Sequence, residues 1–248
     1  MSRTVAPGVH VIGLLMVNVV LLEGRDGWTL IDAGTEGTLG RLRASLRRFG
    51  APASDLRRVL ITHAHPDHVG GLAELVRASG AEVWAPEADR AWVEGPGSPP
   101  RPDPATLRGV HRLLGRIEPT AATPVAVDRV LRGGDRLDAV REGLEVVALP
   151  GHTPGHVGFW LRSERVIVAG DALMHVFPWW HPPIAAFSSD MQQARRSVER
   201  MAALEPRVVV VGHGPPVSLR AGAASSASLA PRLRRALRTF PPVDDARG

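Results

Sequence analysis

Short apolar runs bounded by turn residues alternate with longer segments of helical periodicity along the first third of the chain. Valine, isoleucine and leucine fill the short runs and glycine-containing turns separate them, which is the pattern of β-strands. Leucines at helical spacing over residues 35–49 and 69–79 predict two helices, each followed by a glycine that ends it. The predicted strands of this part cover residues 9–12, 17–22, 28–31, 59–62 and 81–85.

The remaining chain repeats this order of strands followed by a helix. The Pro- and Gly-rich segment 94–104 interrupts the pattern and is expected to be a disordered insert or part of a lid, with a helix over 105–117 after it. The later predicted elements are strands over 145–149, 157–161, 165–169 and 208–211 and a helix over 189–204. Two such halves predict an α/β (α+β) fold in which two sheets pack together and helices cover their outer faces.

Histidine and aspartate side chains gather at the ends of predicted strands, most densely in the stretch 62–71 (THAHPDHVGG). His63 and His65 are two apart in extended chain, so their side chains project to the same side and can bind one ion. The next residue is a proline, which keeps His65 out of helical geometry, and Asp67 and His68 follow after the chain has turned. One loop can therefore contribute ligands to two metal ions.

This loop cannot complete either site, because a hydrolytic metal ion needs about three protein ligands and an open position for water. The missing ligands are expected at other strand ends that face the same cleft. The candidates are His152, Asp171 and His213, each of which follows a glycine that allows a sharp turn at a crowded site.

Composition narrows the chemistry further. The 248 residues include no cysteine, which excludes disulfides and thiolate metal sites and leaves imidazole and carboxylate as metal-binding side chains. One domain over residues 1–240 is expected, followed by a frayed tail at 241–248.

The net charge is +5, but the arginines alternate with leucine as on solvated helix faces, so a nucleic-acid partner is not expected. The apolar stretch 9–22 is too short and interrupted to span a membrane and no signal peptide is recognisable, which predicts a cytoplasmic protein.

Five motifs, in this order, resemble the metallo-β-lactamase superfamily, and its glyoxalase II and lactonase-like branch more than its true β-lactamases. They are 30–34 (LIDAG), 62–71, 150–156 (PGHTPGH), 169–171 (AGD) and 212–214 (GHG). The resemblance covers nearly the whole chain. It implies a metal-dependent hydrolase built as a four-layer αβ/βα sandwich, with two mixed β-sheets flanked by helices.

The resemblance also divides the seven candidate ligands into two sets that share one carboxylate. The first ion would be bound by His63, His65 and His152, the second by Asp67, His68 and His213, and both by Asp171. The implied cofactors are two zinc ions per chain, with iron or manganese as alternatives at nitrogen and oxygen ligands. True β-lactamases of this superfamily generally lack the bridging aspartate, and many use a cysteine instead.

Three residues have roles in or beside this implied centre. A hydroxide held by the two ions would attack the substrate carbonyl, and Asp67 would move the proton. Asp32 is expected to orient metal ligands by hydrogen bonding, and His156 is expected either to support the ligands or to face the substrate.

The loop 173–187, directly after Asp171, is the candidate wall of the substrate pocket. It is rich in tryptophan, phenylalanine and histidine, which indicates either a packed cover over the core or an apolar pocket with a histidine as its polar group, and its position beside Asp171 favours the pocket. The candidate pocket residues are His175, Phe177, Trp179, Trp180 and His181.

The leading interpretation is hydrolysis of a small ester, lactone or thioester. A hydroxyacylglutathione hydrolase of the glyoxalase II type is an alternative, although the chain has neither the Tyr nor the Lys with which those enzymes typically hold glutathione. A metallonuclease or phosphodiesterase and an iron-dependent sulfur dioxygenase are further alternatives. The expected partner is a small-molecule substrate, with no membrane partner, and formation of a homodimer is left open.

Overall fold

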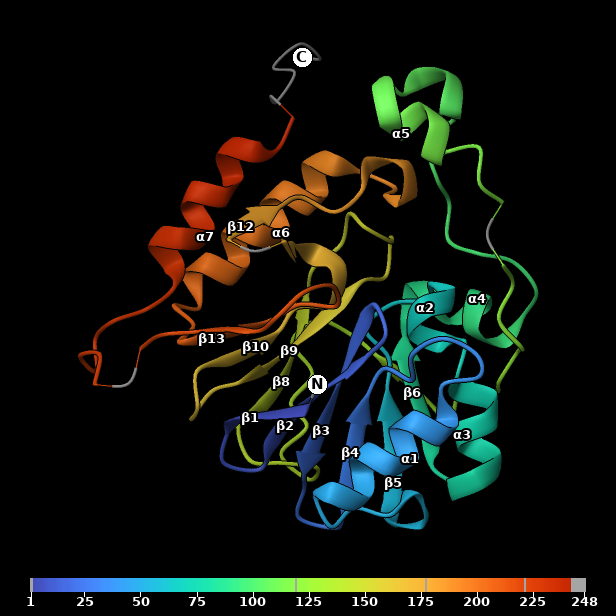
Figure 1. Ribbon diagram of the computed structural model, residues 1–248, viewed down its shortest axis with the longest axis vertical. Coiled ribbons are helices and arrows are strands. Elements are labelled where there is room, and N and C mark those ends of the chain that lie inside the picture. Colours follow the sequence, from blue (N-terminus) through green and yellow to red (C-terminus); the bar gives the residue numbers. More distant parts are fainter. Residues whose placement is uncertain (1, 119, 177, 221, 242–248) are drawn as a thin grey trace.

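Two facing β-sheets form the centre of the computed structural model, which describes residues 2–118, 120–176, 178–220 and 222–241 (Figure 1). The first sheet has seven strands in sequence order, antiparallel from β1 to β4 and parallel from β4 to β7. Its strands are β1 (Ser2–Ala6), β2 (Val9–Leu14), β3 (Val17–Glu23), β4 (Trp28–Ile31), β5 (Leu56–Leu60), β6 (Glu82–Pro86) and β7 (Arg129–Leu131).

The second sheet has five strands in the order β14-β13-β10-β9-β8, in which β10 and β13 are parallel and the other neighbours antiparallel. Its strands are β8 (Leu144–Ala148), β9 (Val157–Leu161), β10 (Val166–Val168), β13 (Val208–Val210) and β14 (Val217–Ser218). A separate hairpin pairs β11 (Met174–Val176) with β12 (Trp179–His181).

Helices cover the outer faces of both sheets, with α1 and α3 on the side of the first sheet and α6 and α7 on the side of the second (Figure 1). The helices are α1 (Leu39–Arg48), α2 (Pro66–Val69), α3 (Leu72–Ser79), α4 (Arg90–Glu94), α5 (Gly109–Leu114), α6 (Met191–Ala203) and α7 (Ala230–Ala236). Within these described residues, no helix has both the length and the apolar character to cross a membrane.

Side chains that alternate along the strands build the layers between these elements. In β4, Leu30 belongs to the apolar layer that includes Leu46 of α1, whereas its neighbour Ile31 belongs to the layer shared by the two sheets. Phe159 of β9 is fully buried between the two sheets. The predicted sandwich of two mixed sheets flanked by helices is therefore confirmed.

The observed boundaries differ from the predicted ones where glycine changes the chain direction. The helix predicted over 35–49 begins only at Leu39, because Gly37 adopts a left-handed conformation with φ of 75°. The helix predicted over 69–79 begins only at Leu72 as α3, and Gly70 and Gly71 separate it from Val69, the last residue of α2. The helix predicted over 105–117 is confined to α5 and the preceding short 3₁₀ turn, and the pattern missed β1, β14 and the β11–β12 hairpin.

Candidate metal centre

Loops from both halves of the chain carry the candidate ligands to one place. The first loop follows β5, and the loops bearing the other ligands follow β8, β10 and β13. Carboxyl ends of neighbouring strands are a usual position for functional side chains in α/β folds. Asn18 helps to hold the last loop against the first sheet, because its Nδ2 donates to the carbonyl oxygens of Val211 (2.9 Å) and Gly214 (2.6 Å).

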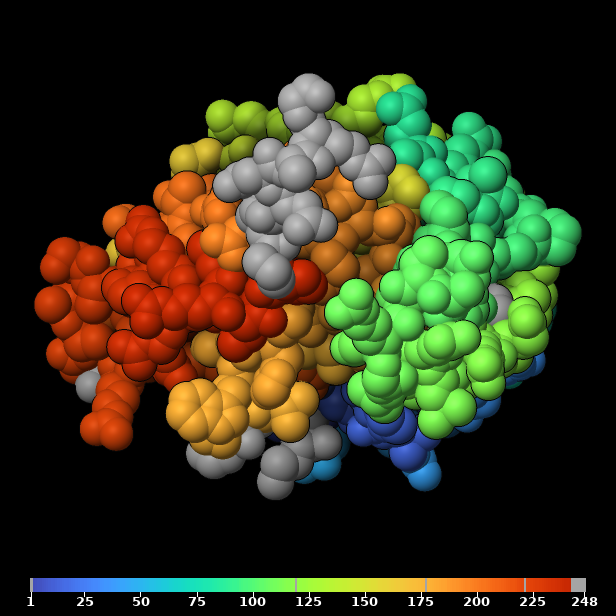
Figure 2. Space-filling view, turned by 90° about the horizontal axis from the view of Figure 1, so that it is seen from above, coloured from blue at the N-terminus to red at the C-terminus, as the bar shows by residue number. Residues whose placement is uncertain are grey.

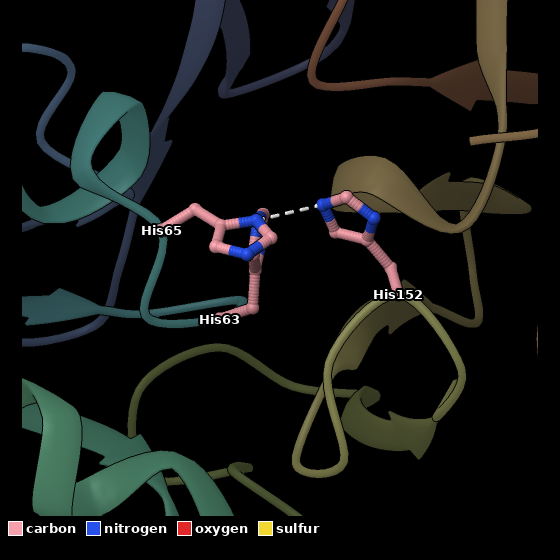
Figure 3. A group of neighbouring side chains, drawn as sticks. All are labelled: His63, His65 and His152. Atoms are coloured by element: carbon pink, nitrogen blue, oxygen red, sulfur yellow. Dashed lines mark hydrogen bonds between the residues drawn. The ribbon is translucent and has the colours of Figure 1, made fainter. Parts of the chain in front are cut away.

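The first group consists of His63, His65 and His152, whose candidate ligand atoms all lie within 4.8 Å of one another. The three imidazoles come from facing loops and converge, as Figure 3 shows. A hydrogen bond of 2.8 Å joins His65 Nδ1 to His152 Nε2, and the two rings meet edge to face. All three side chains are buried.

The second group consists of Asp67, His68, Asp171 and His213, also within 4.8 Å of one another. His213 Nε2 lies 3.0 Å from Asp67 Oδ2 and 3.0 Å from Asp171 Oδ2. The Cα of Gly212 runs so close to this group that a Cβ there would collide with Asp171 Oδ1. Glycine is therefore required beside the cluster.

Asp171 lies between the two groups. Its Oδ1 is 3.4 Å from His68 Nε2 in the second group, and its Oδ2 is 3.5 Å from His152 Nε2 in the first. The carboxylate sits in the 3₁₀ turn Gly170–Ala172 directly after β10, and its backbone N–H donates to His156 Nε2 at 3.0 Å. One side chain thus contacts both groups.

Hydrogen bonds to the outer ring nitrogens orient four of the imidazoles toward the centre. Each bond engages Nδ1, which leaves Nε2 directed at the other ligands, as in known metal sites. The pairs are His63 with Thr62 Oγ1 (3.0 Å), His68 with Asp32 Oδ2 (2.8 Å), His152 with Ser188 Oγ (3.0 Å) and His213 with the carbonyl oxygen of Met16 (2.8 Å).

Three buried polar atoms of the two groups make no hydrogen bond with described residues, namely His63 Nε2, His68 Nε2 and Asp171 Oδ1, although the last two lie 3.4 Å apart. Buried polar atoms in native proteins are nearly always paired, so an unpaired set needs an explanation. All three belong to the two convergent groups and are nitrogen or carboxylate oxygen donors, which suit a divalent transition metal. The residues present therefore fit metal ions at this position.

Burial and charge set the protonation of the metal-free groups. Burial and the neighbouring imidazoles lower the pKa of His63 and His152 well below the usual value, and burial lowers that of His65 to about 4. These rings are neutral near pH 7 and present free lone pairs. In the second group burial opposes protonation of His213, but its hydrogen bonds to Asp171 and Asp67 raise its pKa to about 10.

A family model described as the metallo-beta-lactamase superfamily matches residues 12–213, a span that includes every residue of both groups. The chain belongs to the metallo-β-lactamase superfamily. It is a metal-dependent hydrolase of that superfamily.

A probable metallo-hydrolase of Bacillus subtilis, YflN, is 28% identical over 243 residues, which cover 92% of each chain. The hydroxyacylglutathione hydrolase of Methylococcus capsulatus is 30% identical over 149 residues, covering 60% of this chain and 44% of that enzyme.

Solved structures of the superfamily share the fold. A metallo-beta-lactamase family protein from Thermus thermophilus aligns with a TM-score of 0.68 at 27% identity, covering 95% of this chain and 80% of that one. The subclass B3 metallo-beta-lactamase BJP-1 of Bradyrhizobium japonicum aligns with a TM-score of 0.70 at 20% identity, covering 96% of this chain and 90% of that one. The second likeness concerns the fold alone.

Asp32 and His156 lie behind the two groups. Asp32 accepts a hydrogen bond from Thr62 N (2.8 Å) and contacts His68, and it adopts an uncommon left-handed backbone conformation with φ of 62°. His156 is buried and lies under Asp171 rather than among the side chains that line the cavity. A position facing the substrate is therefore not what the structure shows for His156, and its role in supporting the ligands stays a prediction.

A cavity of about 390 Å³ opens onto both groups. Five residues of the groups form part of its lining, with a mostly apolar wall and a few polar side chains around them. The remaining lining residues are Met16, Pro66, Ser98, Arg101, Ile117, Glu118, Thr120, Met174, Ile184 and Phe187.

The loop after Asp171 contributes differently from what its aromatic content predicted. Trp179, Trp180 and His181 line a separate cavity beside α7, because the β11–β12 hairpin packs Trp180 into the apolar layer of that helix. His175 is buried against Trp180 and its Nδ1 is 2.9 Å from the carbonyl oxygen of Pro215. These four residues do not line the cavity at the metal groups, and Phe177 lies outside the described residues.

Asp89 is a site residue that the sequence pattern did not reveal. It is fully buried and accepts hydrogen bonds from Ala64 N (3.0 Å), Thr153 Oγ1 (2.6 Å) and Gly155 N (2.7 Å). The first donor belongs to the loop of His63 and His65 and the others to the loop of His152. Asp89 therefore fixes the two loops of the first group relative to each other.

Replacing Asp89 with asparagine is expected to lower the free energy of unfolding by about 2 kcal/mol, since an amide N–H₂ would face donors that now have an acceptor. Metal affinity is expected to fall about 10- to 100-fold, as for other residues that orient ligands. Chemical denaturation and competition with a zinc chelator measure the two effects. Asp103→Asn, at an exposed carboxylate that also accepts a backbone N–H, is the matched control. Unchanged zinc affinity in Asp89→Asn would contradict the positioning role.

Acid is expected to destabilise the metal-free protein between pH 6.5 and 4. The pKa of His65 is lowered to about 4 and that of His156 to about 3, both chiefly by burial, so the unfolded chain takes up protons first as the pH falls. Each such group removes up to about 1.4 kcal/mol of stability per pH unit in this window. Burial raises the pKa of Asp89, so this single carboxyl takes up its proton in the folded state first and slightly offsets the loss of stability. Denaturation midpoints of chelator-treated protein measured across this range test the sign, and an unchanged or rising stability would refute it.

Proposed function

We propose that this hydrolase holds two metal ions, zinc by preference, and cleaves a small ester, lactone or thioester. The observation that carries the proposal is the position of Asp171, which lies within 3.5 Å of ligand atoms of both groups. Two ions that share a carboxylate would sit close together, as in other two-metal hydrolases. The absence of cysteine leaves donors that suit zinc but also accommodate iron or manganese.

When bound, such ions would supply Lewis acidity, lowering the pKa of a water and polarising a carbonyl oxygen. The chain's own residues would supply the rest. Asp67 combines contact with His213 and access to the cavity, with 37% of its side chain exposed. This position suits it to accept a proton from the attacking water and to pass it to the leaving group.

The cavity supports a small, largely apolar substrate. Its volume of about 390 Å³ is at the lower end of the range for small-molecule sites. Met174, Ile184 and Phe187 form part of its apolar wall and follow Asp171 in the chain. Zinc-loaded protein is therefore expected to hydrolyse members of a panel of short-chain nitrophenyl esters, lactones and thioesters. Absence of turnover across the whole panel would oppose the proposal.

A hydroxyacylglutathione thioester is the second candidate, because a relative of that name is 31% identical over 159 residues. The chain spans less than half the length of these relatives, 44% to 48%. It also lacks Tyr and Lys side chains that could hold glutathione. Comparing kcat/KM for S-lactoylglutathione with that for simple thioesters separates the two, and a strong preference for the glutathione conjugate would favour the second.

A further inference from the structure

One arginine in the cavity wall has no carboxylate partner. Arg101 is half-buried, lines the cavity of the metal groups, and makes no ion pair with any described residue. Many other arginines of the chain pair with an acid, among them Arg58, Arg132 and Arg141. The lining residues that the structure describes include no other arginine or lysine. Arg101 is thus a cation beside the metal groups with no described carboxylate oxygen within 4.0 Å of it.

Its guanidinium is nevertheless held in place. Nη1 donates to the carbonyl oxygen of Ile117 (3.0 Å), and the guanidinium carbon lies 5.7 Å from the centroid of the Phe187 ring. Pro100, the residue before Arg101, accepts a hydrogen bond at its carbonyl oxygen from Ser189 Oγ (2.9 Å). The backbone N–H of Ser189 donates to the carbonyl oxygen of His152 (3.1 Å). Through Ser189, the backbone beside Arg101 is therefore connected to the backbone of His152, a candidate metal ligand. The Nη2 and Nε atoms of Arg101 donate to no described residue.

Residues 95–118, which we call the cap segment, bring this cation over the site. In Figure 2 the green part of the cap segment faces the yellow-orange residues that follow Asp171 on the same side of the molecule. Residues 94–104 were expected to be a disordered insert or part of a lid, and in the structure Ser98 and Arg101 of this stretch line the cavity.

We propose that Arg101 is an anion subsite, and that the substrate carries a carboxylate joined by a short apolar chain to the ester or thioester bond. A guanidinium with two neighbouring donors available matches the two oxygens of a carboxylate, and partial burial strengthens that pairing. Glu118 also lines the cavity, but neither of its oxygens lies within 4.0 Å of Arg101. This inference rests on the proposed hydrolysis at the metal groups and names its substrate class.

The test compares two esters of equal chain length on zinc-loaded protein: 4-nitrophenyl hemiglutarate, which carries a carboxylate, and neutral 4-nitrophenyl valerate. Arg101→Gln is expected to raise KM for the hemiglutarate about 10- to 100-fold, the usual effect of a charge-assisted hydrogen bond, and to change kcat/KM for the valerate less than about twofold. Arg101→Lys should restore part of the loss. Arg108→Gln, at an exposed arginine of the cap segment outside the cavity lining, should change neither ester. Equal effects of Arg101→Gln on both esters, or no effect on either, would overturn the inference.

Binding of the acids alone separates this inference from the proposed function. Calorimetric titration of zinc-loaded wild type should show tighter binding of glutarate than of valerate, and Arg101→Gln should abolish the difference. If neither ester is hydrolysed but this difference is found, the anion subsite stands and ester hydrolysis fails. If both esters are hydrolysed with equal KM and both acids bind equally, hydrolysis stands and the subsite fails.

Discussion

Asp171→Asn is expected to lower kcat/KM by about 10³-fold, because in the proposed centre two ions, each worth several kcal/mol of transition-state stabilisation, would share this carboxylate. Asparagine has nearly the same shape but offers one neutral oxygen. It cannot balance the charge of two cations, and its N–H₂ would face His68 or His213. The mutant should also retain fewer metal ions, so elemental analysis and steady-state kinetics should change together.

Asp138→Asn is the matched control. Asp138 pairs with Arg136 on the surface and is not among the residues that line the cavity, so its substitution should leave activity unchanged. Because Asp171 is buried, the thermal unfolding of the mutant must be compared with that of wild type. A folded Asp171→Asn protein with wild-type turnover would remove the bridging role from the account.

Removing metal with a chelator is expected to abolish hydrolysis and to lower the melting temperature. Ligands that bind only the folded state contribute about 4 kcal/mol at a concentration a thousandfold above Kd. Zinc should restore both properties, whereas magnesium, which prefers oxygen ligands, should not. The measurements are activity and calorimetric melting of chelator-treated protein before and after each ion is added.

The pH dependence of metal uptake has a definite sign. In the metal-free protein the pKa of His68 is raised well above its usual value and that of His213 to about 10, so both rings hold protons near pH 7. Metal binding must displace these protons, and affinity should therefore rise with pH between 6 and 8. Full activity after exhaustive chelation, or zinc affinity that falls as the pH rises, would contradict this picture.

The local part of the site was predictable because its residues are close in sequence. Alternation in extended chain put His63 and His65 on one side, and the turn at the proline after them sent Asp67 and His68 elsewhere, which the structure shows as helix α2. Glycines before His152, Asp171 and His213 were visible signals of close backbone approach. The role of these seven residues as metal ligands stays a prediction until an ion is measured.

Contacts between distant segments were not predictable from the pattern. Asp89 is an ordinary acid after a strand in the sequence, and only the folded chain brings it to Ala64 and Gly155. The aromatic residues of the β11–β12 hairpin had the composition of a pocket wall, but burial against α7 decided where Trp180 lies. Arg101 fell in a segment whose Pro and Gly content indicated only irregular structure.

The central claim is a centre of two metal ions that acts as one catalytic unit. Titrating zinc into metal-free protein while measuring both bound metal and ester hydrolysis tests it most directly. We predict that activity reaches its maximum only as bound zinc approaches two ions per chain. Full activity at one bound ion per chain, or hydrolysis by protein that binds none, would contradict the account.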